Sequence, residues 1–307
     1  MVAGKSQRVV VVGSAGRDLA IGMTSLPEAN ASAPIERTME RLGGKGANIA
    51  AGIRQLNPEC SVSLIAVLGV DRAGEAVLED ALDLGIDTAC VARRGETSLL
   101  VDLVDDSAER RILEQVSPEA SVREEDVRSA AMVLGEARVV VLQLRQPVAV
   151  LTRAAELAPG AVVVLDGGFD GAVDSELAER LLTRADIVRA NGEEAEMLAG
   201  HSISSVSDAE RAAADLLNRG PSIVSLTVSG SGDLVAWEGD SHFFPFGDEP
   251  VVDRTGAGDA YVAGLVTGLL RAEPPRELGR RASAAATTAV QQFGGFTRFA
   301  ERSRVDG

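Results

Sequence analysis

A seven-residue segment late in the chain combines glycines with two aspartates. Residues 253–259 read DRTGAGD and run directly into a stretch of small residues, 260–270, that is typical of a helix. Glycine lets the backbone approach a ligand closely, and a helix N-terminus presents free N–H groups that suit a phosphate. A carboxylate beside a phosphoryl group can take the proton of an attacking hydroxyl, which would be the task of Asp259. The spacing alone equally supports a helix cap at Asp259 preceded by a tight glycine turn.

A second glycine-rich segment, residues 43–48 (GGKGAN), also precedes a stretch with helical spacing. It is not a Walker A loop, because Gly46 follows the lysine where Ser or Thr is required. Lys45 and Asn48 are suited to hydrogen-bond a polyhydroxylated ligand. From spacing alone, a plain helix start is the simpler interpretation. Residues 13–18 also lack the glycine pattern of a dinucleotide-binding turn, which disfavours an oxidoreductase.

The composition excludes several other kinds of site. The 307 residues carry 30 Lys and Arg against 46 Asp and Glu, a formal net charge of −16, whereas nucleic-acid binding needs a basic surface. Two cysteines and two histidines are too few for a disulfide framework, a Cys-rich zinc site or a site with several His ligands. No stretch is apolar enough to span a membrane, and the short polar start has no signal-peptide pattern. We therefore expect a cytoplasmic protein that binds neither nucleic acid nor membrane.

The elements around the two glycine segments must position them. Short β-branched runs alternate with stretches of helical spacing, which predicts a parallel sheet covered by helices on both faces, the α/β class. The predicted strands are 8–13, 61–68, 139–144, 162–166, 187–190, 223–228 and 234–237. The predicted helices are 44–56, 73–84, 148–157, 260–270 and 278–293.

One region breaks this alternation. Segments 98–104 and 110–116 alternate in polarity and are joined by the polar turn DDSAE, which predicts a β-hairpin projecting from the α/β body. The stretch 23–42 lacks a buried-strand pattern and is expected to join this hairpin. Parts of 14–42 and 97–117 would then form a small β lid over one edge of the sheet. Arg110 and Arg111 would either reach a substrate or a second subunit or, as is commoner for such residues, lie on a solvated strand edge of this lid.

Taken together, GGKGANIA and DRTGAGDAYVAG resemble the two sequence motifs of the PfkB (ribokinase-like) carbohydrate kinases. Three shorter elements agree with that family in the same order. Residues 69–74 resemble its GxDxxG turn, 191–194 its NxxE element and 227–232 its TxGxxG nucleotide loop. The resemblance covers residues 9–297. Several independent motifs in the correct order exclude a chance match far better than any one of them alone.

The resemblance implies a single ribokinase-like α/β kinase domain over residues 1–307: a three-layer α/β/α sandwich with a mainly parallel central sheet and a small β-sheet lid. It also implies transfer of the γ-phosphoryl group of ATP to a hydroxyl of a sugar or sugar derivative, with Mg²⁺ and K⁺ as cofactors. The alternatives are a nucleoside kinase of the same fold and a non-catalytic sugar or nucleotide sensor. The intact Asp259 and its preceding glycines disfavour the sensor.

Individual residues acquire roles from the same resemblance. Asp259 would be the catalytic base, and charge on the transferring phosphoryl group would be stabilised by the amides of Gly256, Ala257 and Gly258. The substrate would be held by Asp18, Gly44, Lys45, Asn48 and Arg145, and the nucleotide by Asn191, Thr227 and Gly232. Glu194 would bind Mg²⁺ through water. A monovalent cation would be held by backbone carbonyls near Asp253 and Thr255, together with the 294–295 region.

Arg145 departs from the family pattern, because members that phosphorylate ribose carry a glutamate at this place. A guanidinium there would bind an acidic group of the substrate, such as a phosphate or carboxylate. Alternatively, it would stay solvated or pair with an acidic residue of the lid. The lid also favours a homodimer, because its hairpin offers apolar side chains to a second copy of the chain. These side chains are Leu99, Val101, Leu103, Ile112 and Leu113.

Overall fold

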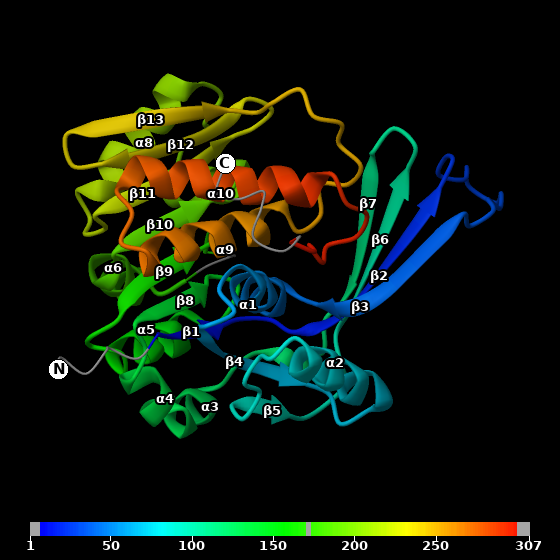
Figure 1. Ribbon diagram of the computed structural model, residues 1–307, viewed down its shortest axis with the longest axis horizontal. Helices are drawn as coiled ribbons and strands as arrows, with labels where there is room; N and C mark the ends of the chain where they lie inside the picture. The colour runs from blue at the N-terminus through cyan, green and yellow to red at the C-terminus, as the bar shows by residue number, and fades with distance from the viewer. Residues whose placement is uncertain (1–6, 170–172, 300–307) are drawn as a thin grey trace.

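The computed structural model describes residues 7–169 and 173–299. A nine-stranded sheet crosses the molecule in the order β13-β12-β11-β10-β9-β8-β1-β4-β5 (Figure 1). Its strands are β1 (Arg8–Val12), β4 (Ser61–Leu68), β5 (Val91–Arg93), β8 (Val139–Gln143), β9 (Val162–Asp166), β10 (Ile187–Ala190), β11 (Ile223–Val228), β12 (Gly232–Trp237) and β13 (Asp240–Pro245). In this spatial order, neighbouring strands from β11 through β8 and β1 to β5 pair in parallel. At the other end, β12 and β13 continue the sheet antiparallel. The mainly parallel sheet predicted from the sequence is confirmed.

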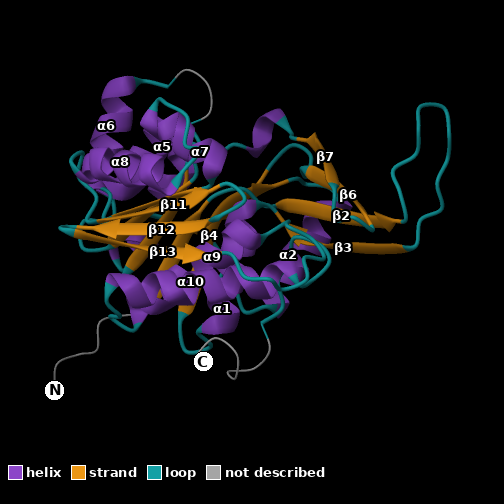
Figure 2. Ribbon diagram, turned by 90° about the horizontal axis from the view of Figure 1, so that it is seen from above, coloured by secondary structure: helices purple, strands orange, loops and turns teal. Residues whose placement is uncertain are grey.

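Helices cover both faces of this sheet (Figure 2). One face is covered by α1 (Lys45–Leu56), α2 (Arg72–Asp83), α9 (Ala257–Leu270) and α10 (Pro275–Val290). The other is covered by α3 (Glu124–Ser129), α4 (Ala131–Gly135), α5 (Val148–Glu156), α6 (Ser175–Arg184), α7 (Gly192–Ala199) and α8 (Val206–Leu217). In β1, Val9 and Val11 pack into the first layer, whereas Val10 and Val12 pack into the second. A strand buried on both faces must be apolar throughout, which explains its unbroken valine run. In the described part of the chain, no helix is long and apolar enough to cross a membrane.

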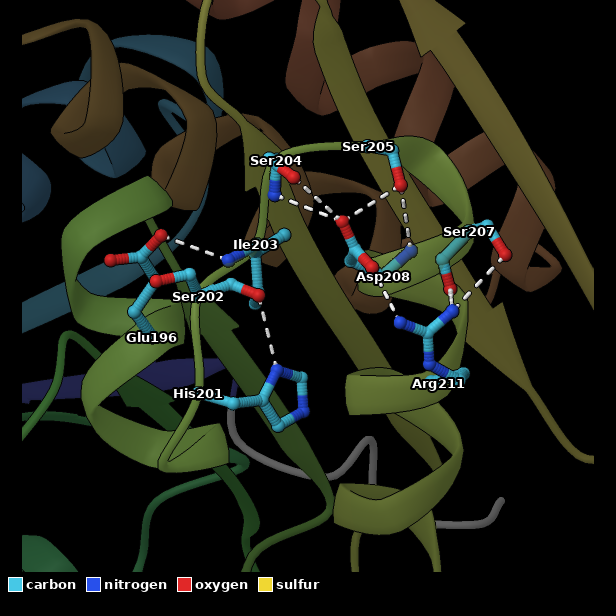
Figure 3. Close-up of polar contacts among 9 residues, drawn as sticks. All are labelled: Glu196, His201, Ser202, Ile203, Ser204, Ser205, Ser207, Asp208 and Arg211. Atoms are coloured by element: carbon cyan, nitrogen blue, oxygen red, sulfur yellow. Dashed lines mark hydrogen bonds and ion pairs between the residues drawn. The ribbon is translucent and has the colours of Figure 1, made fainter.

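A polar network fixes the junction between α7 and α8 (Figure 3). Ser205 is the N-cap of α8, and its hydroxyl accepts a hydrogen bond from the amide of Asp208 at 3.2 Å. The carboxylate of Asp208 in turn accepts from the hydroxyls of Ser204 and Ser205. The carboxylate of Glu196, on α7, accepts from the amide of Ile203 at 2.8 Å. These bonds are internal to the two helices and their connection, so the cluster is structural.

A separate four-stranded sheet projects beyond one end of the large sheet (Figure 1). We call it the small sheet; its order is β3 (Arg37–Gly43), β2 (Gly16–Met23), β6 (Leu99–Asp105) and β7 (Arg110–Gln115). β2 and β6 pair in parallel, and the outer two pairs are antiparallel. The hairpin predicted at 98–104 and 110–116 is β6 and β7. That the small sheet acts as a lid, and that residues 1–307 form one domain, stay predictions; 1–6, 170–172 and 300–307 lie outside the described residues.

The register of the small sheet decides which side chains face the body. Side chains directly opposite each other on paired strands share a face. Asp102 lies opposite Ala20 and Ile112, and Ala20 lies opposite Met39. A Cβ added at Gly294 would lie 1.9 Å from Met39 Cε and 3.5 Å from Ala20 Cβ, so this face meets the body. We call it the inner face; its members include Asp18, Ala20, Met39, Leu100, Asp102, Arg110, Ile112 and Glu114.

Candidate active site

Asp259 lies in the first turn of α9, with its side chain buried. The helix is capped not by Asp259 but by Gly256, whose φ is 77°. A Cβ added at Gly256 would lie 2.0 Å from the carbonyl oxygen of Gly295. Only glycine therefore fits this turn. The helix-cap interpretation of Asp259 is wrong, since its carboxylate faces the neighbouring helix α1 instead.

The surroundings of Asp259 adjust its acidity. Its Oδ2 accepts a hydrogen bond from the side-chain amide of Asn48 at 3.2 Å. Burial raises the pKa of Asp259 to about 7, and Asp166 adds to the rise, whereas Lys45, Asn48 and Arg189 lower it. A carboxyl group that titrates near neutral pH can accept a proton and release it again, which suits a general base.

The glycines of residues 43–48 allow three chain segments to meet beside Asp259. A Cβ added at Gly43 would lie 1.9 Å from Asp18 Cγ, and one at Gly46 would lie 2.8 Å from the Cα of Gly13. Gly44 is the N-cap of α1 with a φ of 87°. These close approaches leave no room for side chains at the glycines. The structure thus brings the predicted substrate residues Asp18, Gly44 and Asn48 together with the predicted base.

Asp18 shares the acidic character of this region. Burial raises the pKa of Asp18 to about 6, and the carboxylates of Asp102 and Glu114 add to the rise. The Asn48 side chain and the Gly44 amide hydrogen-bond Asp18 and lower its pKa in part. The remaining acceptor of Asn48, its Oδ1, is buried without a hydrogen-bond partner. A buried acceptor of this kind is suited to a hydroxyl donor from a ligand.

Lys45 extends to the other side of the site. Its Nζ lies 2.6 Å from Glu194 Oε1. Burial lowers the pKa of Lys45, but Asp166, Glu194 and Asp259 outweigh burial, so the net shift is upward. Burial likewise raises the pKa of Glu194, but Lys45 and Arg189 outweigh it, so Glu194 is held ionised. Glu194 and Asn191 also form a capping box at the start of α7, with reciprocal hydrogen bonds of 3.0 Å.

A buried ion pair beside the α9 turn was not predicted from the sequence. Arg189 Nη1 lies 3.1 Å from Asp166 Oδ1, and both side chains are buried. A Cβ added at Gly258 would lie 2.9 Å from the Arg189 guanidinium, so this cation supports the turn. The available signal was a charged residue at the carboxyl end of two otherwise apolar strands, where α/β sheets bind ligands.

The predicted nucleotide residues lie at the ends of β11 and β12. The Thr227 hydroxyl donates to Asp233 Oδ1 at 2.7 Å, and Gly232 pairs with Val228. A Cβ added at Gly192, the first residue of α7, would lie 2.1 Å from Ser229 Oγ. The loop between the two strands therefore rests against the start of α7, which brings Thr227 and Gly232 to the same edge as Asn191.

The Asp253 carboxylate holds the loop before α9 in shape. Its Oδ1 accepts from the amide of Thr255 at 2.9 Å and lies 2.7 Å from the hydroxyl oxygen of that residue, and its Oδ2 accepts from the amide of Gly294 at 2.8 Å. Thr255 also contacts the small sheet, because its hydroxyl donates to Asp102 Oδ2 and accepts from Arg110 Nη1 at 2.8 Å. Arg110 thus lies on the exposed edge strand β7, as expected, and in addition contacts the loop before α9.

Arg145 makes the contact with a small-sheet acid that was one of its predicted alternatives. Its Nη1 lies 3.4 Å from Glu114 Oε1, and both side chains are substantially exposed. Exposed pairs of this kind contribute about 0–1 kcal/mol to stability. Contact of Arg145 with a substrate stays a prediction.

The donor set near Glu194 fits a magnesium ion delivered with a nucleotide. Among residues 7–169 and 173–299, no cluster of three or more His, Cys, Asp or Glu side chains is arranged to hold a metal ion. However, the Oδ2 of Asp166 is buried without a hydrogen-bond partner, and Glu194 is held ionised nearby. Mg²⁺ commonly binds one or two carboxylates together with substrate phosphates and water.

Comparison with known proteins shows which family the chain belongs to. Residues 6–300 match the pfkB family carbohydrate kinase model. The chain is 27% identical to a ribokinase of Haemophilus influenzae over 93% of each chain. It is 30% identical to an ATP-dependent ribose-1-phosphate kinase of Halopiger xanaduensis, covering 84% of this chain and 83% of that relative. The structure of Arabidopsis thaliana ribokinase complexed with ribose and ATP superposes with a TM-score of 0.76 at 25% identity, covering 94% of this chain and 93% of that one. The chain belongs to the pfkB family of carbohydrate kinases.

Proposed function

We propose that this protein transfers the γ-phosphoryl group of ATP to a hydroxyl group of a sugar or sugar derivative, with Asp259 as the general base. The observation that carries this proposal is the setting of Asp259. Its buried carboxylate, with a pKa of about 7, lies at the N-terminus of α9 beside Asn48. The positive end of the α9 dipole, which favours a phosphoryl group, thus lies beside a carboxylate that can accept a proton.

The reaction follows from this geometry. Asp259 takes the proton of the acceptor hydroxyl, and the resulting oxygen forms a bond to the γ-phosphorus. The bond between that phosphorus and the β–γ bridging oxygen breaks, and ADP leaves with the electron pair. The amides of Gly256, Ala257 and Gly258, in the first turn of α9, stabilise the negative charge on the transferring group.

The remaining residues bind and orient the two reactants. Asp18, Gly44 and Asn48 hold the acceptor, and the free Oδ1 of Asn48 accepts one of its hydroxyls. Thr227, Gly232 and Asn191 line the nucleotide site. Lys45, between Glu194 and Asp259, neutralises phosphate charge. Mg²⁺ would be held by Glu194, largely through water, and Asp166, and it would neutralise phosphate charge when bound.

A monovalent cation is proposed beside the catalytic loop. Backbone carbonyls near Asp253 and Thr255, with that of Gly295 packed against Gly256, would hold K⁺. The carboxylate of Asp253 would stabilise the positive charge from within the loop. Activity is then expected to be higher in potassium than in an equal concentration of a tetraalkylammonium salt.

The first test is release of ADP from MgATP across neutral sugars, sugar phosphates, sugar acids and nucleosides. Turnover with a sugar class supports the proposal, and the Asp259→Asn variant is then expected to bind the acceptor but turn over slowly. Turnover only with nucleosides favours a nucleoside kinase. Ligand binding by a folded wild-type protein that turns over no acceptor favours a sensor and contradicts the proposal.

The small sheet is further proposed to bind a second copy of the chain. Its outer face carries Leu19, Ile21, Leu99, Val101, Leu103 and Leu113 by register, and Leu113 is 58% exposed. Ile112, which was predicted to join this surface, lies on the inner face instead. Leu113→Glu is expected to shift a dimer toward monomer in sedimentation velocity, and a wild-type monomer at all concentrations would contradict the proposal.

A further inference from the structure

An acidic side chain occupies a buried position on the inner face of the small sheet. Asp102 is in the middle of β6 and is only 2% exposed. Its Oδ2 accepts a hydrogen bond from the Thr255 hydroxyl, but its Oδ1 is buried with no hydrogen-bond partner. A carboxylate oxygen buried without a donor is costly, so the protein must gain something from keeping it there.

The groups around Asp102 leave this oxygen uncompensated. Burial raises the pKa of Asp102, and Asp253 adds to the rise, whereas the Thr255 hydroxyl and Arg110 lower it. Arg110 donates its Nη1–H to Thr255 Oγ1 at 2.8 Å and acts on Asp102 only through its charge. The free Oδ1 is therefore suited to a donor that arrives with a ligand.

The position of Asp102 relative to Asp18 indicates which ligand that is. Asp18 lies opposite Leu100, two residues from Asp102 along β6, so both carboxylates are on the inner face. Two residues along and one strand across correspond to about 8 Å between Cα atoms. The two acids influence each other, since Asp102 raises the pKa of Asp18. Asp102 also contacts Thr255, which directly precedes the Gly256 turn that leads to Asp259.

We propose that Asp102 is a substrate-specificity residue whose free carboxylate oxygen accepts a hydrogen bond from a hydroxyl of the acceptor. This inference rests on the proposed kinase function. Asp18 and Asp102 then bind two hydroxyls of one neutral polyol between the small sheet and the catalytic loop. An acceptor that presents a phosphate or carboxylate to this face is rejected by charge repulsion.

The basic residues near this face do not reverse its preference for neutral acceptors. Arg145 forms its ion pair with Glu114, and Arg110 donates to Thr255. Asp18 and its acidic inner-face neighbours Asp102 and Glu114 outnumber Arg41, which lies opposite Asp18 on β3. The local charge thus opposes an anionic acceptor, although Arg145 considered alone would favour one.

The decisive experiment compares kcat/KM for variants against acceptors that lack single hydroxyls. Asp102→Asn keeps the shape of the side chain and removes its charge. With the preferred neutral sugar, we expect kcat/KM to fall about 10- to 100-fold, as for loss of a hydrogen bond to a charged group. With the deoxy sugar that lacks the recognised hydroxyl, wild type and Asp102→Asn are expected to differ less than 3-fold, because the interaction is already absent.

Asp106→Asn is the matched control. Asp106 is on the turn of the same hairpin and is exposed, so its loss of charge should leave kcat/KM unchanged for every acceptor. Fluorescence-monitored unfolding of each variant shows whether Asp102→Asn remains folded. Asp102→Ser, which keeps a smaller hydrogen-bond acceptor, is the second variant if Asp102→Asn does not fold. Its kcat/KM is also expected to fall more for the preferred neutral sugar than for the deoxy sugar.

Two results would overturn this inference while leaving the kinase function intact. One is an equal loss of kcat/KM for all acceptors, deoxy sugars included, which would make Asp102 purely structural. The other is a wild-type preference for sugar phosphates or sugar acids over neutral sugars. Absence of ADP release with every acceptor is a different failure, because it contradicts the proposed function itself.

Discussion

The side-chain amide of Asn48 donates a hydrogen bond to the carboxylate of Asp259 across 211 positions of the chain. The donor lies in the first turns of α1 and the acceptor in the first turn of α9. The N-termini of two helices therefore converge on one carboxylate. Both the hydrogen bond and the converging dipoles favour its ionised form against the cost of burial.

Loss of this hydrogen bond is expected to change the pH dependence of catalysis. In Asn48→Ala, the pKa values of Asp259 and Asp18 both rise, because Asn48 lowers each of them. The acidic limb of kcat/KM against pH should move to higher pH. Gln55→Ala, at the far end of the same helix, is the control and should leave the limb in place. If the acidic limb does not move in Asn48→Ala, the pH dependence of kcat/KM does not reflect the ionisation of Asp259.

Asp259→Asn is expected to lose activity and gain stability. Removal of a general base typically costs about 10²- to 10⁴-fold in kcat. The pKa of Asp259 is raised from 3.8 to about 7 in the folded protein, so the contribution of this group to stability is fully present below pH 3.8 and is lost as pH rises through 7. The variant avoids that loss, and its gain in unfolding free energy should be greater at pH 8 than at pH 5 by roughly 3 kcal/mol. Denaturant titrations at both pH values measure this, and equal gains would contradict the assignment.

Because Arg189 and Asp166 form a buried ion pair, we expect the effect on stability of substituting one residue to depend on whether the other is present. Arg189→Met leaves the carboxylate of Asp166 buried without its cation and should destabilise the protein by about 3–5 kcal/mol. The double variant Arg189→Met, Asp166→Asn should recover much of that loss, because no unpaired charge remains. Urea unfolding of Arg189→Met, Asp166→Asn and the double variant tests this coupling. Additive losses of unfolding free energy would show that the two residues stabilise the protein independently of each other.

Gly256→Ala is expected to disrupt the catalytic turn. Its φ of 77° disfavours a side chain, and the new Cβ would lie 2.0 Å from the Gly295 carbonyl oxygen. We expect a cost of about 1–3 kcal/mol in stability and a loss of kcat, since the turn amides are displaced. Gly160→Ala is the control, because nothing lies within 4 Å of a Cβ there. Equal kcat in the two variants would argue against an anion-binding turn at 256–258.

Apolar periodicity was sufficient to predict seven of the nine strands of the large sheet, all but β5 and β13, and five of its covering helices. The doubly buried strands and the small-residue helices α1, α9 and α10 have patterns that few other structures permit. Helix α6 was not predicted, although Ala178, Leu181 and Leu182 follow helical spacing. Strand β13 has no clear signal, because it is an edge strand with mostly half-exposed residues.

The site was predictable where glycine is required and not where distant charges meet. The turn at Gly256 and the contact between Gly43 and Asp18 leave glycine motifs in the sequence. The pairing of Arg189 with Asp166 depends on which parallel strands are neighbours, which local patterns do not specify. The inward placement of Asp102 depends on strand register, where a shift of one residue would reverse the face.

The contact between Asp253 and Gly294 also constrains the order of folding. The loop before α9 receives its shape from an amide that follows α10, 41 positions later. The turn at Gly256 is likewise packed against Gly295. The catalytic loop therefore cannot be complete until α10 has docked beside α9. During refolding from denaturant, recovery of helical circular dichroism should precede recovery of enzymatic turnover, so activity reports the last step of folding rather than the first.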